Sequence, residues 1–182
     1  MNKKQLEWDE YFMRLAETAA LKSKDPGSKN GCVIVDKEHR VVSMGYNGLV
    51  RGADESKMTL SERPMKYRFS THSEMNAVLF ARRDLSGCTI YNFMATCDNC
   101  LKYCLQAGIK RFVYKQFRVN SYKADPANSM TNYESDEAIV RLLASMPEVE
   151  TYNIENGKTY IEEILDSYSK DSDEYKKLKS WL

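Results

Sequence analysis

The chain has 182 residues, of which 42% are hydrophobic and 29% are charged, and its formal net charge at pH 7 is +1. That charge gives no general positive field for a polyanion, so we expect no nucleic-acid partner. No apolar run approaches the roughly 20 residues of a membrane helix, and the first residues lack the apolar core of a secretion signal. The cysteines number five, and three of them crowd between residues 97 and 104, which favours reduced thiols and a cytoplasmic location over a disulfide framework.

The first part of the chain predicts a helix followed by a hairpin. Apolar residues recur with helical spacing over 5–23, and a turn with Pro and Gly at 25–28 ends the helix. Short β-rich runs at 32–35 and 41–44 flank a polar turn, so we expect them to pair as antiparallel strands. A long irregular loop is expected from there to about residue 71.

The rest of the chain alternates helices with strands. The predicted elements are a helix over 73–83, a strand over 89–95, a helix over 98–107, a strand over 111–115, a helix over 136–145, a strand over 149–154 and two amphipathic helices in the tail. Residues 116–131 are polar and rich in turn formers, which indicates an insertion. This order predicts an α/β fold: a three-layer α/β/α sandwich around a five-stranded mixed sheet, with extra C-terminal helices. We expect one domain over 1–154 and a C-terminal helical extension over 155–182, packed on the domain or on a neighbouring subunit.

Two motifs carry the chemistry. His72-Ser73-Glu74 precedes Cys97-Asp98-Asn99-Cys100 by one helix and one strand, and this is the layout of zinc-dependent nucleobase deaminases. His72, Cys97 and Cys100 are the predicted metal ligands, and three such ligands suit Zn²⁺ while leaving a position for water. Glu74 cannot easily reach the metal that its neighbour binds, so we expect it to be the catalytic group that moves protons. The sequence thus predicts hydrolytic deamination with one catalytic zinc ion per chain.

The same cysteines are compatible with other uses. A Cys-x-x-Cys pair also serves redox chemistry or structural zinc. Cys104 lies one helical turn beyond Cys100, so a closed site with three cysteines and His72 is conceivable. A closed site would leave Glu74 without a purpose, and the joint pattern therefore favours a catalytic metal.

Further motifs extend this pattern well beyond the metal site. They are Trp8-Asp9-Glu10-Tyr11-Phe12-Met13, Ser23-Lys24-Asp25-Pro26-Gly27-Ser28, Gly45-Tyr46-Asn47-Gly48, Lys66-Tyr67, Gln106-Ala107-Gly108-Ile109-Lys110 and Tyr133-Glu134-Ser135-Asp136-Glu137-Ala138. With them the chain resembles the deoxycytidylate (dCMP) deaminases of the cytidine deaminase superfamily, from about residue 7 to residue 150. The resemblance implies a cytidine-deaminase-like fold, conversion of dCMP to dUMP for thymidylate synthesis, and a homo-oligomer, often a hexamer, with dCTP and dTTP as effectors.

The resemblance also implies how the substrate is held. Asn47 would contact the deoxyribose or the base, and Tyr133 would close over the sugar-phosphate. Lys24, in a matching motif, and Arg51 and Lys66, in the charge-rich loop, are the expected cationic substrate-binding residues. The alternative for these cations is plain solvation.

Four departures from the family pattern bear on specificity and regulation. Thr96 stands where the family has proline, and it could serve as a helix N-cap. Ala95 replaces a bulky aromatic, which could admit a 5-substituted cytosine or a different base. Val50 and Arg51 replace a proline-containing stretch in a loop associated with effector binding, which argues against regulation by dCTP and dTTP. The insertion at 116–131 could form a lid over the phosphate or only a surface loop.

These departures leave other functions open. The main alternative is a deaminase of a different mononucleotide, either a 5-modified dCMP or a purine deoxynucleotide. A deaminase of single-stranded nucleic acid would need a basic groove with stacking aromatics. A non-catalytic zinc-stabilised protein would use Cys104 to complete the metal shell.

Overall fold

The structure is a computed structural model that describes residues 7–62, 64–117 and 133–182. Its elements are α1 (Trp8–Ala20), β1 (Gly31–Val35), β2 (Val41–Tyr46), β3 (Gly48–Leu49), α2 (Lys66–Phe69), β4 (Ser70–Thr71), α3 (Ser73–Ala81), β5 (Thr89–Met94), α4 (Asp98–Gln106), β6 (Arg111–Gln116), α5 (Tyr133–Ala144), β7 (Glu150–Asn153), α6 (Tyr160–Asp166) and α7 (Asp173–Lys179). None of the described helices is long and apolar enough to cross a membrane.

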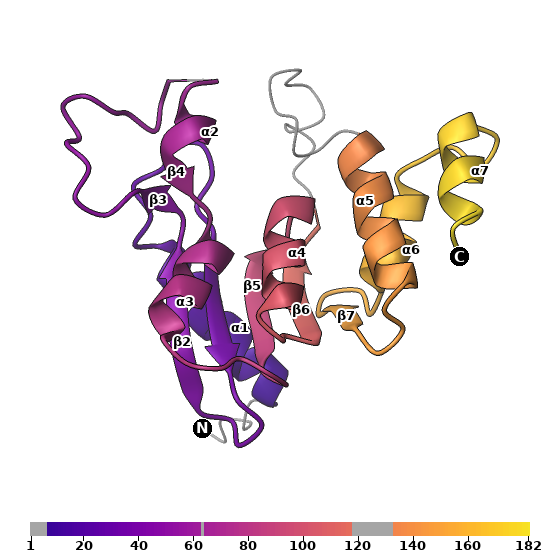
Figure 1. Ribbon diagram of the computed structural model, residues 1–182, viewed down its shortest axis with the longest axis horizontal. Helices are drawn as coiled ribbons and strands as arrows, with labels where there is room; N and C mark the ends of the chain where they lie inside the picture. Colours follow the sequence, from indigo (N-terminus) through magenta and orange to yellow (C-terminus); the bar gives the residue numbers. More distant parts are fainter. Residues whose placement is uncertain (1–6, 63, 118–132) are drawn as a thin grey trace, which may run out of the picture.

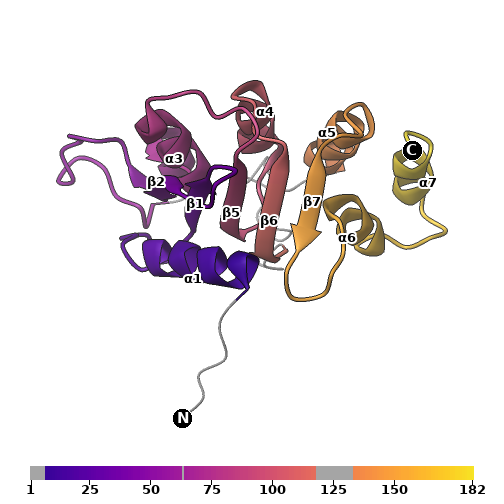
Figure 2. The same ribbon diagram turned by 90° about the horizontal axis from the view of Figure 1, so that it is seen from below.

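The sheet has the strand order β2-β1-β5-β6-β7. β1 pairs antiparallel with both β2 and β5, whereas β5, β6 and β7 run parallel to one another. Figure 2 shows α1 on one face of the sheet and α3, α4 and α5 on the other, with α6 and α7 beyond the β7 edge. The predicted three-layer sandwich around a five-stranded mixed sheet is confirmed.

Element boundaries differ from the prediction in a few places. The loop expected as far as residue 71 contains a short strand pair, β3 with β4, and the helix α2 (Figure 1). The helix α3 ends at Ala81 because Arg82 takes the left-handed conformation, with φ of 50°. The helix α5 begins at Tyr133, earlier than predicted. Apart from its first two residues, the predicted 116–131 insertion lies outside the described residues.

Alternation along the strands builds a core on each face of the sheet. Ile34 and Ile90 belong to the larger apolar cluster, which includes residues of α3, α4, α5 and α6. Val33 and Tyr91, their neighbours in sequence, pack with residues of α1 in a second cluster. This is the period-two pattern of strands buried on both faces.

One glycine fixes how closely α3 approaches the sheet. A Cβ added to Gly45 of β2 would lie 2.1 Å from the carbonyl oxygen of Ser73 and 2.6 Å from the backbone nitrogen of Ala77. Both are far inside van der Waals contact, so only glycine allows this approach. The Cys32 thiol, on the neighbouring strand, donates to the same Ser73 carbonyl at 3.1 Å. The first turn of α3 is therefore held against β1 and β2.

The tail packs on the described domain. Tyr160, Ile164 and Leu165 of α6 and Leu178 of α7 are members of the larger apolar cluster. The helix α6 begins with a capping box formed by Thr159 and Glu162. The division of the chain at residue 154 into a domain and an extension stays a prediction.

Candidate active site

His72, Cys97 and Cys100 come together at the starts of two helices. His72 occupies the N-cap position of α3, and Cys97 occupies that of α4. The Nδ1 atom of His72 lies 3.5 Å from Sγ of Cys97 and 3.4 Å from Sγ of Cys100. The three ligand atoms all lie within 4.8 Å of one another, and no other such group occurs among the described residues.

The donor set fits zinc. A tetrahedral ion with Zn–N of about 2.0–2.1 Å and Zn–S of about 2.3 Å separates its nitrogen and sulfur ligands by about 3.6 Å. The two observed N···S distances, 3.5 and 3.4 Å, are close to that value. Cys104 lies outside the group; it is fully buried in the larger apolar cluster, where burial raises the pKa of its thiol. A closed site with a third cysteine is therefore not what the structure presents.

The electrostatics of the cluster favour a thiolate at Cys97. A hydrogen bond from Cys100, together with the contact to His72, lowers the pKa of Cys97 well below the ordinary thiol value of 9.0, although burial acts in the other direction. Burial lowers the pKa of His72, but the hydrogen bond and charge of Cys97 outweigh it and raise that pKa to about 9. The start of α4 adds the positive end of a helix dipole, which also stabilises thiolates. Cys97 thus carries its sulfur as the thiolate, the form in which a cysteine binds a metal.

Glu74 lies in the first turn of α3 and is almost completely buried, with 2% of its surface exposed. Its Oε1 accepts a hydrogen bond from Nδ2 of Asn92 and its Oε2 accepts one from the Ser73 hydroxyl, both at 2.8 Å. Burial raises the pKa of Glu74 above its ordinary 4.5, and the nearby His72 offsets part of that rise. A raised pKa favours the protonated form of Glu74, which suits a group that must accept a proton and return it.

Cys97 is the N-cap of α4, and its sulfur accepts from the Cys100 backbone N–H at 3.5 Å. Thr96, which could have served as the cap, does not. Thr96 is buried instead. Its hydroxyl accepts from Asn92 at 3.3 Å, and its carbonyl accepts from the Tyr160 hydroxyl of α6 at 2.7 Å. Thr96 therefore joins the residue before Cys97 to β5 and to α6.

The Asn47 side chain joins the loop before β3 to residues 28–30. Its Oδ1 accepts from the Asn30 backbone N–H at 2.8 Å, and its Nδ2 donates to the Ser28 carbonyl, also at 2.8 Å. These bonds use about half of what a carboxamide can donate and accept. The Asn47 amide therefore keeps capacity for a ligand.

The three predicted cations have different surroundings. Lys66 is buried, and its ammonium donates to both carboxylate oxygens of Asp25, at 3.0 and 2.8 Å. Lys24 is exposed and pairs with Glu55 at 2.7 Å. The exposed Arg51 guanidinium lies 4.5 Å from the centre of the Phe80 ring. Lys66 thus joins α2 to the 25–28 turn, while Lys24 and Arg51 face solvent.

Tyr133 is the first residue of α5, and this helix contacts the start of α4 through Ser135. The Ser135 hydroxyl donates to Asp98 Oδ1 at 2.8 Å, and Asp98 is the residue after Cys97. The Tyr133 ring is half-buried and meets the Tyr168 ring edge-on at 6.1 Å. The position that sequence resemblance assigned to the sugar-phosphate side is thereby tied to the start of α4.

Two residues that contact Glu74, Asn92 and Ser73, were missed by the sequence reasoning. The sequence pattern indicates Asn92 only as part of the strand over 89–95, and Ser73 only as the middle of the His-x-Glu motif. A signal was present for Asn92, since an amide inside an otherwise apolar strand is costly unless it is hydrogen-bonded.

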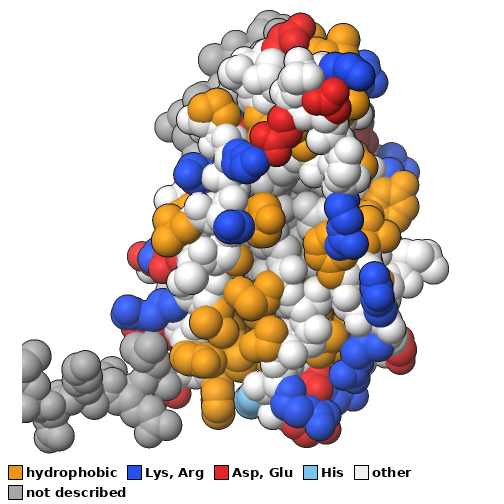
Figure 3. Space-filling view, turned by 90° about the vertical axis from the view of Figure 1, so that its left-hand side faces the viewer, with side chains coloured by type: hydrophobic (Ala, Val, Ile, Leu, Met, Phe, Trp, Pro, Cys, Tyr) orange, Lys and Arg blue, Asp and Glu red, His pale blue; other side chains and the backbone are white. Residues whose placement is uncertain are grey.

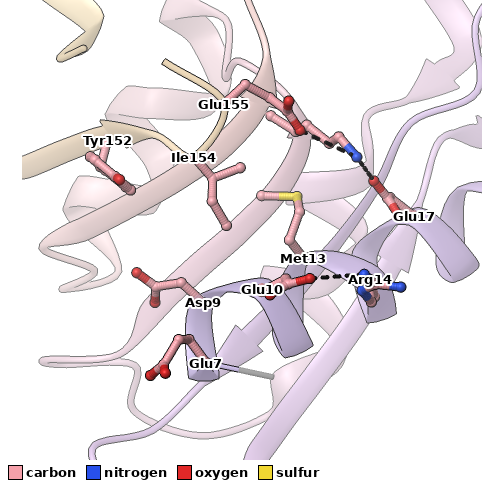
Figure 4. A pocket seen from close by; sticks show the side chains of 10 residues that line it. Glu7, Asp9, Glu10, Met13, Arg14, Glu17, Tyr152, Ile154 and Glu155 are labelled. Carbon is pink, nitrogen blue, oxygen red and sulfur yellow. Dashed lines mark hydrogen bonds and ion pairs between the residues drawn. The ribbon is translucent and has the colours of Figure 1, made fainter. Parts of the chain in front are cut away.

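A pocket of about 650 Å³ lies elsewhere, beside α1 (Figure 4). Its lining consists of one side of α1 with its N-cap and of residues near the ends of β6 and β7: Glu7, Asp9, Glu10, Met13, Arg14, Glu17, Lys115, Tyr152, Ile154 and Glu155. Lys115 pairs with Glu17 and Glu155 across it. None of the predicted site residues lines this pocket, so it is distinct from the metal cluster.

Comparison with known proteins identifies the family. Residues 6–116 match the family model described as the cytidine and deoxycytidylate deaminase zinc-binding region. Deoxycytidylate deaminase of Homo sapiens is 36% identical over 115 residues, which are 60% of this chain and 65% of that protein, so the match spans just under two thirds of that relative. Probable deoxycytidylate deaminase of Drosophila melanogaster is 30% identical over 164 residues, 84% of this chain and 79% of that protein.

A solved structure shares the fold. The apo dCMP deaminase from the cyanophage S-TIM5 superposes with a TM-score of 0.54 at 24% identity, covering 63% of this chain and 86% of that one. This likeness bears on the fold alone. The matched family region contains His72, Glu74 and both cysteines of the cluster. The chain belongs to the cytidine and deoxycytidylate deaminase family, with its zinc-binding region over residues 6–116.

Proposed function

We propose that this protein hydrolyses dCMP to dUMP and ammonia and so supplies dUMP for thymidylate synthesis. The observation that carries the proposal is the approach of His72, Cys97 and Cys100 ligand atoms to within 4.8 Å, with the Glu74 carboxyl buried in the adjacent turn. The curated deoxycytidylate deaminases at 36% identity support the choice of substrate. In the overall reaction, a water oxygen bonds to C4 of cytosine, the bond from C4 to the amino nitrogen breaks, and ammonia leaves.

His72, Cys97 and Cys100 would hold one zinc ion per chain. A zinc ion held by three ligands supplies a Lewis acid that makes a bound water acidic near neutral pH. Glu74 takes one proton from the attacking water and delivers it to N3 of the base. It then takes the second proton from the hydroxyl added at C4 and passes it to the amine, which leaves as ammonia while the C4 carbonyl forms. Its burial keeps bulk water from competing for those protons.

Substrate contacts are assigned within the same proposal. Asn47 contacts the deoxyribose or base through its remaining amide capacity, and Tyr133 closes over the sugar-phosphate. Lys24 and Arg51 are exposed, and the ion pair of Lys24 with Glu55 is a surface pair that a phosphate could replace at little cost. Lys66 could reach a phosphate only by releasing Asp25. We therefore propose Lys24 and Arg51 as the first phosphate ligands and Lys66 as their support.

The protein is proposed to act as a cytoplasmic homo-oligomer, with the hexamer as the expected size. The side formed by β2 and α3 shows a gathering of apolar side chains in Figure 3. Its exposed large residues are Val41, Met44, Tyr46, Leu79 and Phe80, and such patches are common at subunit contacts. Sedimentation velocity tests this proposal, and a monomer at micromolar concentration would reject it.

We further propose that dCTP and dTTP do not regulate the enzyme, because Val50 and Arg51 replace the proline-containing stretch of the effector loop. Addition of dCTP or dTTP to the ammonia assay tests this, and a change in rate would contradict it.

A nucleotide panel tests the activity. Purified protein with its zinc content measured is assayed for ammonia release from dCMP, 5-methyl-dCMP, CMP, dCTP, dAMP and a single-stranded oligonucleotide. The expected result is fastest turnover of dCMP. Equal or faster turnover of another base would move the assignment to that base, and no ammonia from any nucleotide by the zinc-loaded protein would reject the deaminase proposal.

Glu74→Gln tests the assigned acid-base role. Glutamine keeps the shape and the hydrogen-bonding position but cannot carry a proton, so turnover should fall about 10²- to 10⁴-fold. Zinc content and melting temperature should stay close to those of the parent protein. A Glu74→Gln variant that turns over dCMP at the parental rate would show that another group carries the protons.

A further inference from the structure

A buried asparagine of β5 is the partner of Glu74 that comes from another element. Asn92 is 1% exposed, and its Nδ2 donates to Oε1 of Glu74 at 2.8 Å. The other hydrogen bond to this carboxylate is local, because Ser73 precedes Glu74 in the same turn. Asn92 is therefore the contact that ties the carboxylate of α3 to the sheet.

The orientation of the Asn92 amide is fixed on both sides. Its Oδ1 accepts from Nδ2 of Asn30 at 3.3 Å, and its Nδ2 donates to the Glu74 carboxylate at 2.8 Å. A flipped amide would place its oxygen against the Glu74 carboxylate and its nitrogen against the Asn30 nitrogen, and both contacts would repel. Only one orientation satisfies all these groups.

Asn30 extends the connection to the predicted sugar side. Its Oδ1 accepts from the backbone N–H of Met94 at 2.9 Å, and its own backbone N–H donates to the Asn47 side chain at 2.8 Å. A continuous set of hydrogen bonds thus runs from Asn47 through Asn30 and Asn92 to Glu74. Such a connected network resists rearrangement more than separate bonds do.

We propose that Asn92 is a positioning residue that holds the Glu74 carboxylate in the orientation from which it exchanges protons with the substrate. This inference rests on the proposed deaminase function. Positioning groups around metal sites commonly change activity about 10- to 100-fold when they are removed. The alternative is that Asn92 only satisfies a buried carboxylate and so contributes to stability alone.

The chain offers a matched control for that alternative. Asn153 ends β7, is 2% exposed, and donates from Nδ2 to Oε1 of a buried glutamate, Glu163, at 2.8 Å. The two asparagines thus share burial, strand context and bond length, but Glu163 has no proposed part in the reaction. Leucine is nearly the same shape as asparagine, so Asn92→Leu and Asn153→Leu remove comparable hydrogen bonds.

The experiment compares the two variants with dCMP as substrate, with zinc content and melting temperature measured alongside. We expect Asn92→Leu to lower kcat about 10- to 100-fold while KM stays within about twofold and zinc stays at the parental level. Asn153→Leu should lower the melting temperature but keep kcat within about twofold. If Asn92→Leu does not fold, Asn92→Ser replaces it, since a serine is too short to reach Glu74.

Crystal structures of both zinc-loaded variants give a readout that needs no turnover. Displacement of the Glu74 carboxylate in the Asn92 variant but not in the Asn153 variant supports the proposal. An unmoved Glu74, a parental kcat in the Asn92 variant, or an equal loss of kcat in Asn153→Leu would overturn it. If the parent protein releases no ammonia from dCMP, the proposed function fails separately, and the position of Glu74 in the crystals alone decides the positioning role.

Discussion

A single methyl group at residue 45 should disturb the metal site from a distance. In Gly45→Ala, the new Cβ would lie 2.1 Å from the Ser73 carbonyl oxygen and 2.6 Å from the Ala77 nitrogen. Both atoms belong to the backbone of α3, so no side chain can rotate away to make room. Ordinary contact begins near 3.4 Å, which means that the first turn of α3 must withdraw from β2 by about 1 Å.

The cost follows from that displacement. Overpacking of this kind costs about 1–3 kcal/mol. In a chain of this size each kcal/mol lowers the melting temperature by about 2–4 °C, so a decrease of about 2–12 °C is expected. Ser73 lies between His72 and Glu74, so the same shift moves a metal ligand and the proton carrier. A misplacement of about 1 Å can reduce turnover about 100-fold.

The assay measures melting temperature, zinc per chain and ammonia release from dCMP for Gly45→Ala and for Gly48→Ala. The control position suits this purpose because a Cβ on Gly48 would meet only a Tyr46 ring carbon, at 4.0 Å. Gly48→Ala should behave like the parent protein in all three measurements. The reasoning is refuted if Gly45→Ala matches Gly48→Ala in melting temperature and retains full zinc and turnover.

Two further predictions concern the metal and acid stability. Cys97→Ser should lose most of its zinc on dialysis against a weak chelator, whereas Cys104→Ala should retain it, as measured by elemental analysis. Zinc loss from Cys104→Ala would show that Cys104 is a fourth metal ligand, against the described geometry. Burial raises the pKa of Asp9, but hydrogen bonds from Arg111 and Tyr91 outweigh it and hold that pKa below its ordinary 3.8. The lowered pKa of Asp9 stabilises the folded protein above pH 3.8, and this stabilisation is lost as pH falls through the folded-state pKa. Between about pH 5 and pH 2, the unfolding free energy of the metal-free parent protein should therefore fall more steeply than that of metal-free Asp9→Asn. Equal slopes in urea titrations across that range would contradict this assignment.

The metal cluster was predictable because short-range geometry determines it. A histidine at one N-cap and a Cys-x-x-Cys that starts the next helix are placed by local backbone conformation once the two helices pack side by side. The alternation of strands and helices was equally readable, and it yielded the mixed five-stranded sheet. These features depend on residues close together in the sequence or on strong periodicity.

The polar contacts around the cluster were not predictable for the opposite reason. Asn92 and Glu74 are 18 positions apart, Thr96 and Tyr160 are 64 apart, and Lys66 finds Asp25 at a separation of 41. Lys66 illustrates the difficulty: in a loop rich in charge it was expected to bind substrate, yet it is buried against a carboxylate. Sequence shows that a charged or amide group is present, but only the packed chain shows which buried partner satisfies it.

The tail carries this argument one step further. The Tyr160 hydroxyl donates to the Thr96 carbonyl, one residue before the ligand Cys97, and its ring packs against Tyr114 with centroids 5.4 Å apart. Glu163, one turn along α6, accepts hydrogen bonds from Tyr114 and Asn153. A cut at residue 154 would therefore expose part of the core and leave the Thr96 carbonyl and the Tyr114 hydroxyl without these partners. The segment after residue 154 thus supports the backbone that carries the cysteine ligands.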